Sequence, residues 1–312
     1  MTGTRPIHYR EPLMRRIVRL AVLLSLSLTG ALAVSINPLP GQSPDDFYTG
    51  AGSFTGVALL TMDGIGSCSG SLLYTGMHIL TAAHCLDASS NPASVHATFQ
   101  WDGGTATFDG AGIYIPPEWT GDLAGGWDWA LLVLAMPIEN PLIDRYMLAT
   151  DPYQDGGVIT IVGYGIGGTG YDGQDPSTYP FGTRRAGQNE AEASWYGVGR
   201  GGNATLVYDF DGAGINTLGS VGLGPGQEVM ITSGDSGGPS FRNGVIVGVH
   251  SFVSLPAGET IGMFGQYGTD TRVSSYADLI MAQLYTPEPA SLALAGLGVV
   301  VLLWRFRRGR MG

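Results

Sequence analysis

The sequence predicts an all-β protein. Glycine makes up 50 of the 312 residues, charged residues make up 13% and apolar residues 44%, a balance that suits one large or two small β-rich domains better than a helical bundle. Short apolar or alternating runs follow one another, separated by turns of Gly, Pro, Asp and Asn. Runs of this length and spacing are typical of a sandwich or a barrel. The predicted strands cover residues 56–62, 71–73, 78–81, 130–135, 158–163, 205–208 and 245–250.

One helix and one glycine-rich segment complete this outline. Only residues 274–285 have a helical pattern, with Tyr276, Ile280 and Leu284 on one face. Between residues 156 and 226, 20 of 71 residues are glycine, a spacing too irregular for collagen. We expect this segment to form long turns that join two barrels.

The distribution of charge excludes a nucleic-acid role. The chain has no Lys, and nine of its 15 Arg lie at the two ends, within residues 1–19 and 305–310. Residues 34–286 contain six Arg against 24 carboxylates, which leaves the central body at −18. Such a body repels phosphate backbones.

The N-terminal 33 residues end in the layout of a secretory signal peptide. Basic residues up to Arg19 precede the apolar run 20–28, and a small-x-small cleavage site ends at Ala33. The run is shorter than the roughly 20 residues that a membrane span requires. We therefore predict that residues 1–33 are removed by signal peptidase.

The C-terminal residues 287–312 combine three features in a fixed order. Pro-Glu-Pro at 287–289 precedes an apolar run over 290–304 and an Arg cluster over 305–310. Together they resemble the PEP-CTERM sorting signal of Gram-negative bacteria. The resemblance implies transient anchoring by a transmembrane helix, processing by an exosortase-type enzyme and release to the cell surface or extracellular matrix. A plain C-terminal anchor is the alternative.

The two cysteines, Cys68 and Cys85, point to a disulfide. In an exported chain a lone pair forms a disulfide more often than a metal site or a redox motif. Closing a loop of this size stabilises the fold by about 3 kcal/mol. The histidines are too dispersed to predict a metal site.

Three short motifs carry the chemistry. They are Leu80-Thr81-Ala82-Ala83-His84-Cys85, Asp128-Trp129-Ala130-Leu131-Leu132-Val133-Leu134 and Gly234-Asp235-Ser236-Gly237-Gly238-Pro239. They resemble the His, Asp and Ser motifs of trypsin-like (chymotrypsin-fold) serine peptidases, in the order of that family, and the resemblance extends over most of residues 56–284. It implies two antiparallel six-stranded β-barrels with the active site in the cleft between them, followed by a short C-terminal helix.

The resemblance implies a catalytic triad of His84, Asp128 and Ser236. A serine hydroxyl is a poor nucleophile at neutral pH and needs an adjacent base, which His84 can be because imidazole titrates near neutrality. Asp128 would fix the tautomer of that ring. The backbone N–H groups of Gly234 and Ser236 would form an oxyanion hole. Asp122 is the alternative acid, but no apolar strand follows it. This chemistry requires no cofactor and no metal.

The same resemblance places four residues at the substrate pocket. Met230 corresponds to the pocket base and provides no anion for a basic side chain. Val253 replaces the usual wall glycine, Gly268 matches the opposite wall, and Ser251 resembles the residue that supports the triad Asp. These residues favour small or medium apolar side chains at the cleaved position. Asp270 either borders the same pocket, where it would attract a basic group, or faces solvent.

Activation is where the sequence departs from the family pattern. In the family, a newly released N-terminal amine pairs with the residue before the nucleophile, here Asp235. Residues 34–67 contain no Arg or Lys, so cleavage after a basic residue cannot release such an amine. We therefore hypothesise that signal peptidase itself exposes Val34, and that either its amine or a different donor satisfies Asp235.

Three functions fit the sequence. The first is an exported, monomeric serine endopeptidase over residues 34–286, acting on protein or peptide substrates. The second is an inactive module that keeps the fold and serves as a surface or matrix binding domain. The third is hydrolysis of esters by the same acyl-enzyme chemistry. The intact triad favours the first.

Overall fold

The computed structural model describes residues 34–151, 157–195, 197–219 and 222–285. The chain divides into two units, which are treated separately. The first ends at Ala277 and holds all the strands of the described residues. The second begins at Asp278, inside helix α3 (Ala277–Leu284). The helix expected over 274–285 is thus present as a 3-10 turn, η5 (Val273–Ser275), and then α3.

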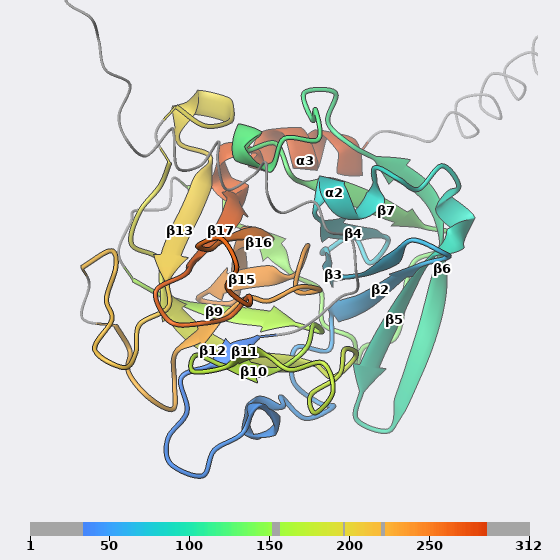
Figure 1. The fold of residues 1–312 in the computed structure, drawn as a ribbon. Coiled ribbons are helices and arrows are strands. Elements are labelled where there is room, and N and C mark those ends of the chain that lie inside the picture. The colour runs from blue at the N-terminus through green and yellow to red at the C-terminus, as the bar shows by residue number, and fades with distance from the viewer. Residues whose placement is uncertain (1–33, 152–156, 196, 220–221, 286–312) are drawn as a thin grey trace, which may run out of the picture. The chain divides into compact units, whose positions relative to one another are not determined.

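The first half of the chain forms a closed antiparallel barrel of six strands (Figure 1). Their order around the barrel is β2-β3-β4-β7-β6-β5. A short turn connects β2 to β3, in which the Ile65 N–H donates to Met62 O at 3.0 Å and Gly64 takes a φ of 70° that favours glycine. The strands are β2 (Val57–Met62), β3 (Gly66–Leu72), β4 (His78–Thr81), β5 (Val95–Trp101), β6 (Gly104–Tyr114) and β7 (Ala130–Leu134).

The second half forms a sheet that is rolled into a half-barrel. Its strand order is β12-β9-β15-β16-β17-β13, and a short strand, β8, adds to β16 in parallel. An isolated bridge between Ala193 and Val207 links β13 to the segment after β12. The strands are β8 (Met147–Leu148), β9 (Val158–Gly163), β12 (Arg185–Glu190), β13 (Thr205–Asp209), β15 (Pro239–Arg242), β16 (Val245–Ser254) and β17 (Tyr267–Arg272). The predicted fold class is confirmed, although only the first barrel is closed by strand ladders.

A third, smaller sheet brings the start of the described chain to the nucleophile region. Its order is β11-β10-β1-β14, and Ser35 in β1 is paired with Met230 in β14. Val34, just before β1, is fully buried in the core of the second sheet, together with Met230. The strands are β1 (Ser35–Ile36), β10 (Gly168–Thr169), β11 (Gly173–Gln174) and β14 (Val229–Met230).

The glycine-rich segment 156–226 is more ordered than we expected from its composition. It contributes β9, β12 and β13 to the second sheet and β10 and β11 to the small sheet. Its glycines allow close packing: a Cβ added at Gly187 would lie 2.1 Å from Val229 Cγ1. The strands predicted over 158–163 and 205–208 are thus present as β9 and β13, whereas β10, β11 and β12 stand where we expected long turns.

The expectation of a transmembrane helix is also corrected. No helix in the described part of the chain is long and apolar enough to cross a membrane. The longest, α3, has eight residues, which is about 12 Å of helix against a hydrocarbon core of about 30 Å. The apolar run 290–304, on which we placed that helix, lies outside the described residues, as does the predicted signal peptide 1–33.

Candidate active site

Strand pairing in the first barrel brings His84 and Asp128 together. His84 lies in a one-turn helix, α2 (Ala83–Leu86), which directly follows β4, and Asp128 directly precedes β7. These two strands are antiparallel neighbours with Thr81 opposite Ala130. The end of one strand and the start of the next therefore meet at the same edge of the barrel.

The Asp128 carboxylate holds His84 at two points. Asp128 Oδ2 lies 2.7 Å from His84 Nδ1, and Asp128 Oδ1 accepts the backbone N–H of His84 at 2.9 Å. Asp128 is fully buried, whereas 27% of the His84 side chain is exposed. Burial lowers the pKa of His84, but the charge and hydrogen bond of Asp128 outweigh it, so the pKa is raised above 6.5. The ring is thus fixed in orientation and keeps a solvent-accessible edge.

Two residues of the second sheet also hydrogen-bond Asp128. Ser251 Oγ in β16 donates to Asp128 Oδ2 at 2.5 Å, and Thr271 Oγ1 in β17 donates to the Asp128 backbone O at 2.9 Å. The sequence reasoning anticipated a supporting role for Ser251. It missed the bond of Thr271, which reaches the backbone O of Asp128 and not its carboxylate.

The turn that carries Ser236 is held between the two sheets. Ser236 O accepts the Ser69 N–H of β3 at 2.8 Å, and the Gly237 N–H donates to His250 O of β16 at 2.8 Å. Gly237 has a φ of 77°, and a Cβ there would lie 2.0 Å from Thr81 Oγ1, so only glycine fits. Ser236 is half-buried and, in the described part of the chain, makes no hydrogen bond to His84. Such bonds are often long without substrate.

Two backbone N–H groups of this turn are free to bind an oxyanion. Within the described residues, neither the Gly234 N–H nor the Ser236 N–H donates to a protein acceptor. The φ of 93° at Gly234 lies in the region that favours glycine. Because both donors flank the Ser236 side chain, they can stabilise negative charge that develops next to it.

Asp235, the residue before Ser236, is buried and accepts hydrogen bonds from neutral donors. It accepts the N–H of Thr232 at 2.9 Å, the N–H of Gly165 at 3.3 Å and the Thr232 hydroxyl at 3.3 Å. Burial raises the pKa of Asp235 to about 7, against the opposing effects of the His250 charge and these hydrogen bonds. A positively charged partner would therefore stabilise the ionised form of this carboxylate.

A second buried His–Asp pair lies on β16 and β17. His250 Nδ1 is 3.0 Å from Asp270 Oδ1, and the Tyr208 hydroxyl donates to the same oxygen at 3.0 Å. All three side chains are fully buried. The alternative in which Asp270 faces solvent is therefore wrong.

The residues expected at the substrate pocket lie in or next to the second core. Met230 is fully buried there, and Val253 packs against the same cluster. A Cβ at Gly268 would lie 2.2 Å from Tyr208 Cε2, so the tyrosine ring occupies the space beside this glycine. Ser251 is committed to Asp128. The residue expected at the pocket base is thus apolar, and the Tyr208 ring lies beside the glycine expected at the opposite wall.

The cysteines form a disulfide next to His84. Cys68 of β3 and Cys85 of α2 are joined with an S–S distance of 2.04 Å and a Cα–Cα distance of 6.3 Å. Cys85 Sγ lies 3.8 Å from His84 Nε2. Donor atoms of Cys68, His84 and Cys85 lie within 4.8 Å of one another, but sulfurs bound in a disulfide are not thiolate ligands for a metal. The bridge instead ties the His84 helix to the barrel.

Other candidate residues have structural roles. Asp122, the alternative acid, caps a 3-10 helix, η3 (Leu123–Gly125), by accepting the Ala124 N–H at 3.0 Å.

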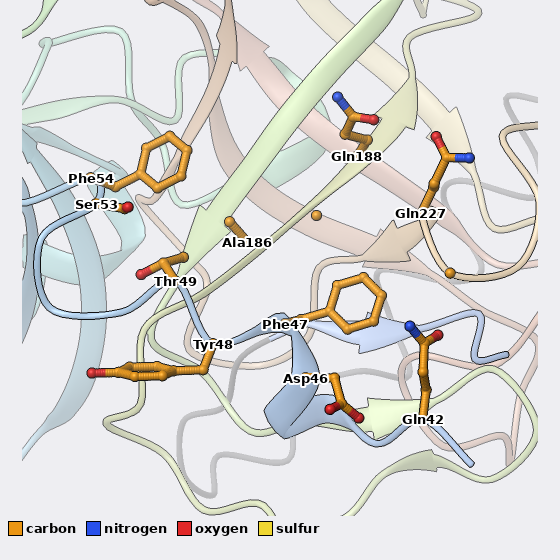
Figure 2. Close-up of a pocket in the computed structure, with 12 residues that line it drawn as sticks. Gln42, Asp46, Phe47, Tyr48, Thr49, Ser53, Phe54, Ala186, Gln188 and Gln227 are labelled. Carbon is orange, nitrogen blue, oxygen red and sulfur yellow. The ribbon is translucent and has the colours of Figure 1, made fainter. Parts of the chain in front are cut away.

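A groove of about 390 Å³ lies where the 3-10 helix η1 (Pro44–Phe47) meets β12. Figure 2 shows the rings of Phe47 and Phe54 on either side of Ala186 in this groove. None of His84, Asp128 and Ser236 lines it.

Comparisons with known proteins agree with this geometry. A family model described as Trypsin matches residues 49–280, and one described as a PEP-CTERM protein-sorting motif matches residues 286–308. A trypsin-like protease of Streptomyces glaucescens is 30% identical over 226 residues, which are 67% of this chain and 71% of that relative. A trypsin of Saccharopolyspora erythraea is 28% identical over 235 residues, 73% of this chain and 91% of the relative.

Proposed function

Because this chain belongs to the trypsin family, we propose that it is an exported serine endopeptidase that works through Ser236, His84 and Asp128. The observation that carries the proposal is the pair of contacts by which Asp128 holds the ring and the backbone N–H of His84, with the Ser251 hydroxyl bonded to the same Oδ2 that contacts the ring. In this arrangement His84 Nε2 is the nitrogen that Asp128 does not engage, on an oriented, partly exposed ring whose described contact at this nitrogen is Cys85 Sγ at 3.8 Å. Such a ring is what a general base needs.

In the proposed reaction, Ser236 Oγ attacks the carbonyl carbon of the scissile bond and its proton passes to His84 Nε2. Asp128 stabilises the imidazolium that results. The N–H groups of Gly234 and Ser236 stabilise the oxyanion, each by roughly 3 to 4 kcal/mol. The C–N bond then breaks as His84 returns the proton to the leaving amine. Water, deprotonated by His84, releases the acyl group and regenerates Ser236.

The test is labelling of the mature protein with a fluorophosphonate probe, which reacts with activated serines. We expect labelling in the wild type and in Ser233→Ala, a matched control three residues before Ser236, and none in Ser236→Ala. If the folded wild type takes up no probe, the chain is an inactive binding module. Peptide and ester substrates tested in parallel separate peptidase from esterase activity.

We also propose that removal of the signal peptide, residues 1–33, activates the enzyme by supplying a partner for Asp235. Val34 is fully buried, and Ser35 is paired with Met230, four residues before Gly234. A Cβ at Gly262 would lie 2.7 Å from Ser35 Cβ and 3.1 Å from Thr232 Cγ2, and Thr232 hydrogen-bonds Asp235. A new amine on Val34 would arise next to a residue that packs by the Thr232–Asp235 segment, and its ion pair with the buried Asp235 carboxylate would order the Ser236 turn.

The proposed specificity is for small or medium apolar side chains at the cleaved position. It is supported by Met230 and Val253 at the apolar core and by the Tyr208 ring beside Gly268. Asp270 is engaged by His250 and Tyr208 instead of standing free for a basic side chain. A panel of peptides with Ala, Val, Leu, Phe, Lys and Arg at the cleaved position tests this. Cleavage confined to Lys and Arg refutes it.

The ends of the chain support a proposal on location. A match to the PEP-CTERM protein-sorting motif over residues 286–308 favours processing by an exosortase-type enzyme and delivery to the cell surface or matrix. We propose that the body 34–286 works there as an acidic monomer on protein substrates. Mass spectrometry of the secreted form reports both termini and checks this.

A further inference from the structure

The buried His250–Asp270 pair stands directly beside the two residues that hold Asp128. His250 of β16 lies opposite Asp270 of β17, and both side chains are fully buried. Ser251 follows His250 in the chain and donates to the Asp128 carboxylate. Thr271 follows Asp270 and donates to the Asp128 backbone O. Each partner of the pair thus precedes a residue that hydrogen-bonds Asp128.

The pairing of β16 with β17 is irregular at Ser251. His250 is opposite Asp270, and two residues further along β16, Phe252 is opposite Thr269. Because Thr269 is only one residue from Asp270, Ser251 is the extra residue of a β-bulge, a feature that re-aims a side chain. The position of this bulge therefore decides whether the Ser251 hydroxyl reaches the triad acid.

The bond between His250 and Asp270 fixes the register of the two strands at the bulge. Glycines lie in both strands, Gly248 in β16 and Gly268 in β17, and glycine-rich strands specify their register weakly. His250 Nδ1 lies 3.0 Å from Asp270 Oδ1, whereas its Nε2 has no hydrogen-bond partner within the described residues. A slip of one residue would separate the two side chains and take a hydrogen bond from a buried carboxylate, which is costly.

Stability alone does not explain a charged pair at this position. Apolar residues of similar volume in place of a buried ion pair often leave stability unchanged or improve it. Selection of one register is the effect that an apolar pair would not reproduce, because only the hydrogen bond is directional.

The backbone of His250 is fixed on the side of the nucleophile turn. Its O accepts the Gly237 N–H at 2.8 Å, and its N–H donates to Gly238 O at 2.9 Å. A Cβ at Gly238 would lie 2.9 Å from His250 Cδ2, so the ring packs directly against this turn. His250 is thus bound to β17 through its side chain and to the Ser236 turn through its backbone, and it sets the position of Ser251 relative to both.

We propose that His250 is a positioning residue of the peptidase. Its bond to Asp270 holds the bulge at Ser251, and the bulge aims the Ser251 hydroxyl at Asp128. The same residue ties the Ser236 turn to this arrangement, so the nucleophile and the triad acid are aligned through one side chain and its backbone. The inference rests on the proposed function, because it takes Asp128 as the triad acid.

The first test compares kcat and KM of mature variants on a chromogenic peptide. His250→Leu removes the bond to Asp270, and we expect kcat to fall by about tenfold to a hundredfold, the range for a lost hydrogen bond to a charged group, with KM unchanged. His250→Asn, whose amide can donate in place of Nδ1, should restore most of the rate. His96→Leu is the matched control and should leave kcat unchanged: His96 also pairs with an opposite aspartate, Asp109 at 2.7 Å, but between β5 and β6.

A double-mutant cycle separates positioning from a general loss of structure. If His250 acts through Ser251, the variant with both His250→Leu and Ser251→Ala loses no more kcat than either single variant, because both changes remove the same contact. Effects that multiply overturn the proposal, as does an unchanged kcat in His250→Leu. If His250→Leu does not fold, His250→Leu combined with Asp270→Leu takes its place in the cycle, since it leaves no buried carboxylate behind.

A second measurement distinguishes failure of this inference from failure of the proposed function. If the folded wild type takes up no fluorophosphonate and cleaves no peptide, the proposed function fails, and the cycle is read from the midpoint of the His84 titration by NMR. His84 is bonded to Asp128, so a displaced Ser251 hydroxyl should shift this midpoint. We expect equal shifts in His250→Leu, Ser251→Ala and the double variant. Unequal or additive shifts, or an unchanged midpoint in His250→Leu, overturn the proposal.

Discussion

The Ser251 hydroxyl lies 2.5 Å from Asp128 Oδ2, so the second sheet hydrogen-bonds the acid that orients a histidine of the first barrel. Ser251→Ala removes a hydrogen bond to a buried carboxylate, which is worth roughly 1.5 to 3 kcal/mol. We expect kcat/KM to fall by about tenfold to a hundredfold, measured on a chromogenic peptide. Ser254→Ala, at the end of the same strand, is the control and should leave kcat/KM unchanged. Equal rates in all three proteins would contradict a role for this bond.

The pH profile of kcat/KM should report His84. A general base must be neutral, and Asp128 raises the pKa of His84 above 6.5 despite burial of the ring. We therefore expect kcat/KM to fall as pH decreases through a midpoint above 6.5. In Asp128→Asn the charge that stabilises the imidazolium is lost, so the midpoint should move to lower pH while the rate drops. An unchanged midpoint would place the titration on another group.

The contact of His84 with Asp128 could be predicted from the sequence because each residue stands in a run of consecutive, distinctive neighbours, while the catalytic role of Ser236 stays a prediction. Strands with apolar residues on both faces, such as β7, could also be predicted from the sequence. Strands β5 and β6 were missed. In β6 only Gly110 is buried, and Thr and Gly stand between its few apolar residues. Its place in the barrel depends on pairing with β5 and β7.

Contacts between distant residues could not be predicted from local patterns. The bond from Tyr208 to Asp270 spans 62 positions, and the bond from Asn37 to Asp211 O spans 174. Read alone, Asp270 fits either a pocket wall or the surface; it is buried only because β13 pairs with β17. Such polar contacts follow from the assembled sheets, which is why the roles of Thr271 and Asp211 emerged only from the structure.

The amine of Val34 should control activity. We expect a chain that begins at Val34 to be active, and a chain with one extra N-terminal glycine to lose about a hundredfold in kcat/KM or more. The reason is that leaving a buried charge unpaired costs roughly 3 to 5 kcal/mol. Asp235→Asn in the Val34 form should lose activity similarly. Equal activity of the two chains, with equal Tm, would show that a different donor serves Asp235.

The buried Asp211 carboxylate should make the free energy of unfolding fall as pH rises. Its pKa is raised in the folded protein from 3.8 to about 7, so the folded state binds more protons than the unfolded state between these values. Its favourable contribution is therefore complete below about pH 4 and is lost as pH rises through about 7.

Asp211→Asn removes this loss, because the amide carries no charge. With both proteins in the Ser236→Ala background, which prevents self-cleavage, we expect Asp211→Asn to be more stable than the parent at pH 8 and similar to it at pH 4, by urea unfolding at each pH. A variant that is no more stable than the parent at pH 8 would show that the Asp211 carboxylate does not cause the loss of stability.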